Sequence, residues 1–469
     1  MTERSAQPHL LDLQGNILRG YRSLPFARFL YYHLHTPAAG RRFIERMIPL
    51  ITPADWGARR PAAATNFAIS FPGLVALDLP LRSQASFPTE FHEGMLGRAK
   101  ILGDTFESDP QRWEPLWRSR AVHVLVSIYG RDSADRDVKA AEIAGIAQDV
   151  DAGPDGRLEE VGHQDAEWPI VDGSRVEHFG FRDGLSNPDI HGVPETPPHF
   201  DIGNPTRAGA FRKVPLGEFV LGWAGEGGES APAPLPHTLG QNASFLVVRK
   251  LEQRVGTFRH FLAERGKLLA RTLGPDLPNE RTPAEYLAAK MMGRWPDGSP
   301  VTVYPDRPGD DPRNDFGYAN DLEGARCPLG AHIRRGYPRD SLGFDGKTVN
   351  RRRIIRRGIA YGRYLPAEEE DDGAERGVMF LAYCSGLDQF EFVQSNWIGT
   401  GEDFLQGDDS DPILGAPKRR MMIPGDPVNH RRPFLCSDIP QFVVMRGGDY
   451  FFVPSIAGLR ILASGKVAI

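Results

Sequence analysis

Two adjoining stretches decide the fold class: AVHVLVSIYG at residues 121–130 and SADRDVKAAEIAGIAQDV at residues 133–150. The first is rich in apolar and β-branched residues, which is typical of a buried strand. The second carries apolar residues at helical spacing, with Ser133 as a candidate cap, and this pattern predicts an amphipathic helix. A strand followed directly by a helix indicates a domain in which helices cover a sheet.

The same alternation precedes these stretches. PFARFLYYHLH at 25–35 predicts a strand, and AAGRRFIERMIPL at 38–50 predicts a helix with Phe43 and Met47 on one face. TNFAISFPGLVAL at 65–77 predicts a second strand. The first part of the chain therefore contains one complete round of strands and helices.

A second round follows in the later part of the chain. Its predicted elements are a strand at 243–251, a helix at 253–266 ended by Gly266, a strand at 378–384, a helix at 387–397, two strands of a hairpin at 441–454 joined by Gly447-Gly448, and a helix at 455–463. The stretch 193–213 between the rounds is polar and rich in Pro and Gly. We therefore predict an α+β fold of two domains, residues 1–210 and 211–469, each an antiparallel sheet with covering helices.

Composition excludes several classes of protein. The chain has 469 residues, and 56 Lys+Arg against 61 Asp+Glu give a net charge of −5, so no basic excess favours nucleic acid. No apolar stretch approaches the roughly 18 residues of a membrane span. The N-terminus has no export signal, which leads us to expect a cytoplasmic protein. Three scattered cysteines make no disulfide framework, and EEEDD at 368–372 is typical of a solvated loop.

Three segments could carry chemistry, and the first is HFGFRDGLSNPDI at 178–190. Gly180 and Gly184 permit a tight backbone and close approach of a bulky ligand. Asp183 at such a turn can project its carboxylate into a pocket. The alternative is an ordinary Asp-Gly turn without function.

The second segment is RCPLGAHIRRGYPRD at 326–340. His332 follows two small residues that leave space beside its imidazole, so it is a candidate metal ligand. Arg334, Arg335 and Arg339 could pair with anionic groups such as propionates or phosphates. The alternative is a structural histidine, and Cys327 with His332 makes a poor zinc site because two ligands are too few.

The third segment is NRRRIIRRGIAYG at 350–362. If it is extended, its side chains alternate, so one of Arg356 and Arg357 points inward and the other outward. An inward arginine needs an anion or a polar ligand, because a buried unpaired charge is costly. The alternative is an ordinary basic surface strand.

Together these segments resemble the dye-decolorizing peroxidases, a family of haem peroxidases. HFGFRDGLSNP carries the family's GxxDG motif, and CPLGAHIRR and IIRRGIAYG are similar to its haem-ligand and distal-arginine segments, in the same order. The resemblance runs from about residue 13 to 463. It implies two ferredoxin-like domains, with haem b (iron protoporphyrin IX) held mainly by the C-terminal one.

The resemblance also implies roles for single residues. His332 is similar to the proximal iron ligand, Asp183 to the distal acid and Arg356 to the distal arginine, with Arg357 as the fallback. Asp183 and Arg356 would be catalytic.

Further residues would bind the cofactor. Phe181 and Gly184 belong to the GxxDG segment, and Val378 and Phe380 fall where the family places apolar residues over the distal haem face. Arg334, Arg335 and Arg339 are candidate propionate partners, and the choice among them stays open. The ring nitrogen of His332 that does not bind iron is expected to donate a hydrogen bond to an acceptor. Asp388 and Glu391 are the alternatives for that acceptor, and the choice stays open.

The implied activity is the oxidation of dyes, phenols and related small aromatic reductants by hydrogen peroxide, through a ferryl state. The resemblance leaves a homodimer open and implies neither nucleic acid nor membrane as a partner. Two alternatives remain: a haem-binding or haem-transfer module without efficient turnover, and a haem-free ferredoxin-like interaction protein. A concentrated sample of the last would be colourless.

Overall fold

The computed structural model describes residues 8–55, 61–154, 156–193, 204–205, 211–273, 282–400, 404–415, 419–425 and 432–467. The two deciding stretches form the predicted elements. β3 (Val124–Gly130) is buried along its whole length, and α7 (Ser133–Asp151) follows it. The cap lies one residue before Ser133, because the Asp132 side chain accepts a hydrogen bond from the backbone N–H of Asp135.

The first half of the chain builds a four-stranded antiparallel sheet. Its elements in chain order are β1 (Phe26–Leu34), α2 (Pro37–Met47), β2 (Ala63–Ser70), β3, α7 and β4 (Leu158–Glu167). The strands lie in the order β2-β3-β1-β4. This is the βαββαβ arrangement of a ferredoxin-like domain.

The second half repeats that arrangement. Its main elements are β9 (Ser244–Gln253), α9 (Val255–Leu273), β10 (Ile355–Arg356), β11 (Ile359–Tyr361), β12 (Gly377–Cys384), α13 (Leu387–Phe392) and β15 (Val443–Val453). The order β10-β12-β9-β15 matches that of the first half strand for strand, and β11 also pairs with β12. The two rounds predicted from the sequence are therefore two copies of one topology.

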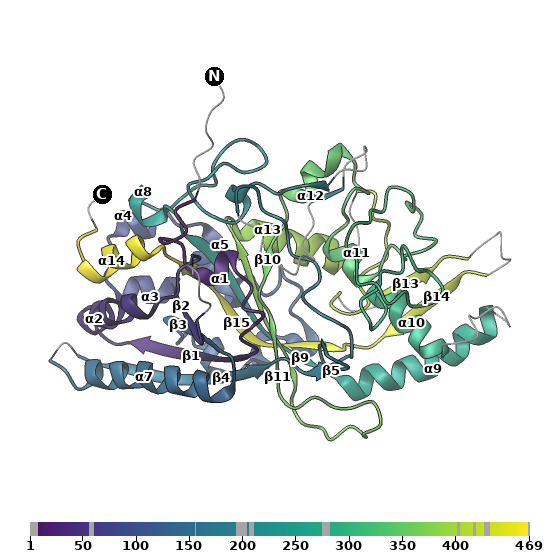
Figure 1. Ribbon diagram of the computed structural model, residues 1–469, viewed down its shortest axis with the longest axis horizontal. Helices are drawn as coiled ribbons and strands as arrows, with labels where there is room; N and C mark the ends of the chain where they lie inside the picture. Colours follow the sequence, from purple (N-terminus) through teal and green to yellow (C-terminus); the bar gives the residue numbers. More distant parts are fainter. Residues whose placement is uncertain are drawn as a thin grey trace.

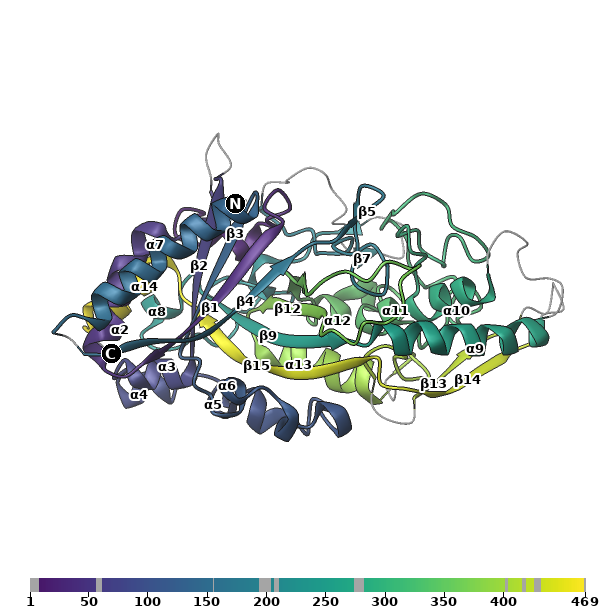
Figure 2. The ribbon, with the colours of Figure 1, turned by 90° about the horizontal axis from the view of Figure 1, so that it is seen from below.

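The remaining elements are short or peripheral. They are α1 (Gly15–Leu18), α3 (Phe71–Ala76), α4 (Leu81–Gln84), α5 (Thr89–Arg98), α6 (Pro115–Arg118), β5 (Ile170–Val171), β6 (Ser174–Arg175), β7 (Asn204–Pro205), β8 (Phe211–Arg212), α8 (His237–Gly240), α10 (Pro283–Met292), α11 (His332–Gly336), α12 (Lys347–Asn350), β13 (Arg419–Ile423), β14 (Phe434–Ile439) and α14 (Ile456–Ser464). Helices α2, α7 and α14 gather at one end of the molecule and α9, α10 and α11 at the other, with the large sheet running between them (Figure 1; Figure 2).

The two halves share one sheet. Strand β15 pairs with β2 through Phe451 opposite Ser70 and Phe452 opposite Ile69. The C-terminal helix α14 packs against α2 of the first half. One hydrophobic core cluster accordingly draws residues from both halves. The predicted boundary at residue 210 lies outside the described residues and stays a prediction.

The predicted hairpin over 441–454 is wrong, because β15 is one continuous strand with a bulge just before Gly447. A side chain at Gly447 would collide with the ring of Trp117, and one at Gly448 would meet the backbone oxygen of Val248. The two glycines are therefore required by close packing and make no turn.

Two predicted ends are also wrong. The strand predicted over 65–77 stops at Ser70, whose hydroxyl caps α3 by accepting from the backbone N–H of Gly73. Helix α9 continues through Gly266 to Leu273. Gly266 lies against the backbone of Ala284, so it permits contact with α10.

Within the described residues, every helix is too short or too polar to span a membrane.

Candidate active site

A cavity of about 570 Å³ lies on the second-half part of the sheet, on the face that α13 covers, and segments from both halves of the chain line it. Val378 and Phe380 on β12 line it, and so do their cross-strand partners Leu251 and Arg249 on β9. Alternate residues of a strand point to one face, so this pairing builds a mostly apolar wall with one guanidinium in it. The volume is in the range of cofactor and ligand sites.

His332 lines this cavity as the first residue of α11. Its Nδ1 atom lies 2.6 Å from Oδ2 of Asp411, a fully buried carboxylate. Burial alone lowers the pKa of His332, but the charge and hydrogen bond of Asp411 raise it more, so that pKa lies above its ordinary value. The carboxylate accepts a hydrogen bond from the Nδ1–H group. In the neutral imidazole the lone pair is then on Nε2.

Asp411 is itself held firmly. Its Oδ1 atom accepts hydrogen bonds from the backbone N–H groups of Ile413 at 2.7 Å and Leu414 at 3.0 Å. Burial raises the pKa of Asp411, but His332 and these N–H groups lower it more, so it stays below its ordinary value. The imidazole therefore faces a fixed negative charge.

The prediction that Asp388 or Glu391 accepts the hydrogen bond from His332 is wrong. The Asp388 carboxylate pairs with Arg352 at 2.9 Å near the surface. Glu391 pairs with Arg98 at 2.6 Å and accepts from the Tyr450 hydroxyl at 2.8 Å. Both carboxylates are thus used elsewhere, and sequence reasoning missed Asp411.

Asp183 and Arg356 line the same cavity, with Oδ1 and Nη1 3.7 Å apart. Gly180 and Gly184 have φ of 91° and 76°, which lets the chain turn tightly around Asp183. The Gly184 N–H donates to Oδ1 of Asp183 at 2.6 Å. The backbone N–H of Arg356 donates to the Asn187 side chain at 2.9 Å. The structure thus brings together His332, Asp183 and Arg356 at one cavity.

A half-buried glutamate that sequence reasoning missed fixes the turn that carries Asp183. Glu177 accepts hydrogen bonds at 2.9 Å from the backbone N–H groups of Phe179 and Phe181, and Gln253 also donates to it. Burial raises the pKa of Glu177 to about 7, although these hydrogen bonds lower it. Its carboxyl lines the cavity, so an acid that titrates near neutrality sits beside Asp183.

The other predicted residues divide into two groups. Phe181, Val378 and Phe380 line the main cavity. Gly184 lies behind Asp183 and lines a second, smaller cavity.

Arg334 and Arg335, predicted as propionate partners, do not line the main cavity. Arg334 donates to the backbone oxygens of Cys327 and Asp321, both at 2.7 Å. Arg335 donates to the backbone oxygens of Trp397 at 2.5 Å and Gln406 at 2.7 Å. Both guanidiniums are buried and serve to tie loops together, so this prediction is wrong.

Other arginines surround the cavity. Its lining includes Arg182, Arg249, Arg294, Arg339, Arg352, Arg353, Arg356 and Arg419. Arg339 and Arg353 lie over the ring of Tyr337, at 4.9 Å and 3.7 Å from its centroid. Both guanidiniums therefore contact the same aromatic ring at the cavity wall.

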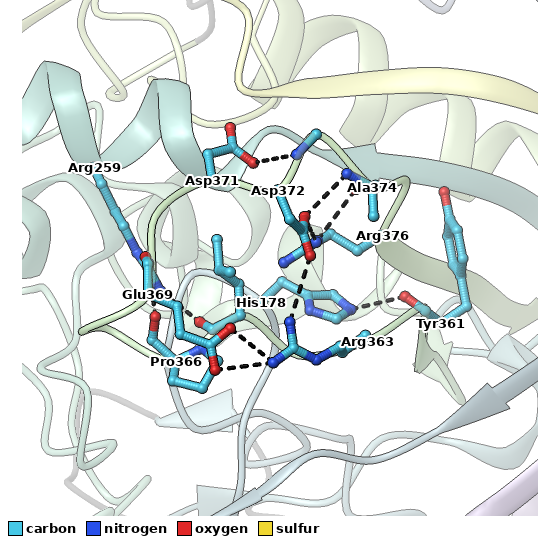
Figure 3. Close-up of polar contacts among 12 residues, drawn as sticks. His178, Arg259, Tyr361, Arg363, Pro366, Glu369, Asp371, Asp372, Ala374 and Arg376 are labelled. Atoms are coloured by element: carbon cyan, nitrogen blue, oxygen red, sulfur yellow. Dashed lines mark hydrogen bonds and ion pairs between the residues drawn. The ribbon is translucent and has the colours of Figure 1, made fainter.

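Next to the Asp183 turn, the acidic run 368–372 forms ion pairs within its own loop. Arg363 pairs with Glu369 at 2.7 Å and with Asp372 at 3.5 Å, and Arg376 also pairs with Asp372 (Figure 3). His178 reaches the same region, with Nε2 2.8 Å from the backbone oxygen of Tyr361 (Figure 3). The run is exposed along its whole length, as predicted for a solvated loop, and part of its charge is neutralised by these ion pairs.

The residues present fit an iron porphyrin. In the described part of the chain, no three His, Cys, Asp or Glu side chains converge as a metal site requires. A porphyrin brings its own nitrogen ligands for iron, so a single protein imidazole such as that of His332 is enough to hold it. The apolar wall suits a flat macrocycle, and the lining arginines suit its anionic side chains. An imidazole backed by a carboxylate, with an acid–guanidinium pair at the same cavity, is the arrangement expected of a haem peroxidase.

Known proteins resemble the chain along nearly its whole length, although no protein-family model matches it. It is 31% identical to dye-decolorizing peroxidase msp1 of Mycetinis scorodonius, over 98% of this chain and 88% of the relative. An ancestral D-type dye-decolorizing peroxidase superposes with a TM-score of 0.80 at 29% identity, over 97% of this chain and 99% of that chain. A dye-decolorizing peroxidase in complex with 2,6-dimethoxyphenol gives 0.78 at 27% identity, over 97% and 100% of the two chains.

The chain belongs to the dye-decolorizing peroxidase family. The family consists of haem-dependent peroxidases, so this protein is an enzyme of that class. The predicted family, the predicted fold of two ferredoxin-like domains and the predicted enzyme class are confirmed.

Proposed function

We propose that the protein binds haem b in the 570 Å³ cavity and uses hydrogen peroxide to oxidise dyes, phenols and related small aromatic reductants. The proposal rests above all on the His332–Asp411 pair at a cavity that Asp183 and Arg356 also line. A structural relative was solved in complex with 2,6-dimethoxyphenol, which supports a phenolic reductant.

His332 would be the protein ligand of the haem iron, through Nε2. The Asp411 carboxylate accepts a hydrogen bond from the Nδ1–H group, with 2.6 Å between Nδ1 and Oδ2, which fixes the tautomer and the ring orientation and makes the imidazole a stronger donor. Haem, when bound, supplies the centre that hydrogen peroxide oxidises and that a reductant returns to its resting state.

Asp183 and Arg356 would handle the peroxide. As the O–O bond breaks, one peroxide oxygen must lose a proton and the departing oxygen must gain one to leave as water. The Asp183 carboxylate can accept that proton and return it. The Arg356 guanidinium, 3.7 Å away, can donate hydrogen bonds to the negative charge on the departing oxygen.

Arg353 would hold an anionic group of the cofactor in place of Arg334 and Arg335, because it lines the cavity. Guanidiniums bind carboxylates through paired hydrogen bonds, which suits a propionate. Arg339 also lines the cavity, but it donates to the backbone oxygens of Asn314 at 2.7 Å and Phe316 at 2.8 Å, so it ties loops together as Arg334 and Arg335 do.

The test is peroxide-dependent oxidation of 2,6-dimethoxyphenol by the haem-loaded protein. We expect turnover that is lost on omission of peroxide and that falls at least 100-fold in Asp183→Asn. A protein that binds haem but does not turn over would instead be a haem-binding or haem-transfer module. A cytoplasmic location and a homodimer stay predictions.

A further inference from the structure

A second cavity of about 260 Å³ adjoins the main one. Asp183, Arg356, Arg182, Leu185 and Gly358 line both cavities. The Asp183–Arg356 pair thus forms part of a common wall, and a molecule in the second cavity would touch that pair from behind.

The second cavity is strongly cationic. Five of its lining residues are arginines, namely Arg22, Arg175, Arg182, Arg356 and Arg357, and among the described residues that line it Asp183 is the sole carboxylate. Tyr21 and Tyr129 also line it, and burial raises the pKa of both phenols, so they stay neutral and offset none of this charge.

Arg175 contributes most clearly to this excess of positive charge. It lies in β6, at the end of the β5–β6 hairpin, and no described acidic side chain pairs with it. Burial and the nearby charge of Arg22 lower the pKa of Arg175. Arg22 is itself held by the backbone oxygen of Gly184, to which it donates at 2.8 Å. Partly buried guanidiniums that repel one another gain free energy when an anion enters between them.

The walls also select the shape of the anion. Trp168, Tyr21 and Tyr129 line the cavity together with the arginines. Tyr21 and Tyr129 already pack with their ring centroids 4.9 Å apart. Aromatic rings and guanidinium planes both stack on flat ligands. A volume of 260 Å³ admits a single ring and excludes a polycyclic dye.

We propose that this cavity binds a small aromatic carboxylate, with the carboxylate among Arg175, Arg22 and the Asp183–Arg356 wall and the ring against Trp168. Binding at this site does not involve the haem iron and does not require turnover. An occupant places negative charge beside Asp183 and Arg356, so it would also slow the reaction with peroxide by competing for the Arg356 guanidinium.

The test is isothermal titration of the haem-loaded protein with benzoate in the absence of peroxide, so that the outcome does not depend on turnover. We expect saturable binding, weakened about tenfold in Arg175→Gln and in Arg22→Gln. Arg118→Gln is the matched control, since it removes the same charge from an exposed site on α6. It should leave the affinity unchanged.

Two comparison ligands test the chemistry. Benzyl alcohol, which has the ring without the charge, and acetate, which has the charge without the ring, should each bind at least tenfold more weakly than benzoate. Equal binding of either one, an equal loss in Arg118→Gln, or unchanged affinity in both cavity variants would overturn the proposal. Circular dichroism of the two variants establishes that they are folded.

Discussion

His332 and Asp411 lie 79 positions apart in the chain, yet their side chains meet at 2.6 Å between Nδ1 and Oδ2. The carboxylate is fully buried, and its other oxygen is occupied by two backbone N–H groups. Such an arrangement gives the imidazole one orientation and one tautomer, which is what a metal ligand requires.

The first prediction concerns this pair. Asp411→Asn removes the negative charge that the imidazole faces, so the affinity for haemin should fall by about 10- to 100-fold. Titration with haemin, followed by Soret absorbance, measures the change. Asp149→Asn is the matched control, because Asp149 pairs with Arg46 at 3.1 Å near the surface and neither residue lines the cavity. Equal losses in the two variants would contradict a specific role for Asp411.

The second prediction separates peroxide chemistry from cofactor binding. Asp183→Asn should retain the Soret band while the second-order rate constant with hydrogen peroxide falls by about 10²- to 10⁴-fold. Stopped-flow spectroscopy gives that constant. Asp189→Asn serves as control, since Asp189 pairs with Lys213 at 3.3 Å and lines neither cavity. A rate in Asp183→Asn within threefold of wild type would assign the proton transfer to another group.

The third prediction distinguishes structural from cofactor-binding arginines. Arg334→Gln breaks a buried ion pair with Asp321 and should lower the free energy of unfolding by about 3–5 kcal/mol. Arg353→Gln, at the cavity wall, should instead weaken haemin binding. Urea denaturation and haemin titration on both variants decide the matter. The reverse assignment of the two effects would restore Arg334 as a cofactor ligand.

The fourth prediction is a pH dependence that comes from Glu177. Its pKa in the folded protein is about 7, against an ordinary value of 4.5, so the folded state binds more protons than the unfolded state between these values. The stability linked to this group is therefore fully present below pH 4.5 and is lost as the pH rises to about 7.

In Glu177→Gln this loss cannot occur. We therefore compare the unfolding free energy of the variant with that of the wild-type protein. From pH 5 to pH 8 this difference should shift by about 2 kcal/mol in favour of the variant. Urea denaturation of the haem-free protein at a series of pH values measures it. The control variant Glu142→Gln, at an exposed position, should show no such pH dependence. If the difference between Glu177→Gln and the wild-type protein does not change with pH, Glu177 does not titrate between pH 5 and pH 8.

Local patterns predicted much of the fold. β3 and α7 follow from a run of apolar residues and a helical period, and Asp183, His332 and Arg356 were found from short segments whose spacing the family shares. Each of these features is encoded within one contiguous stretch of the chain. Alternation along an extended segment left the choice between Arg356 and Arg357 open, and the choice of Arg356 rested on the Ile-Ile-Arg-x-Gly pattern that the segment shares with the family.

The features that were missed depend on contacts between distant segments. Asp411 reaches His332 only through tertiary folding, and nothing near DDSDP at 408–412 marks it as a partner. The raised pKa of Glu177 arises from burial, which the neighbouring residues do not reveal. Arg334 and Arg335 lie near His332 in sequence, but the short helix α11 directs them toward backbone oxygens instead of the cavity.

The most direct test is a haemin titration of wild type and His332→Ala, read by the Soret band. The wild-type protein should take up one haem per chain with a sharp, saturable Soret band. The His332→Ala protein should lose that band while the exposed His35→Ala control keeps it. A wild-type protein that binds no haem, or a His332→Ala protein with an unchanged band, would contradict iron ligation by His332.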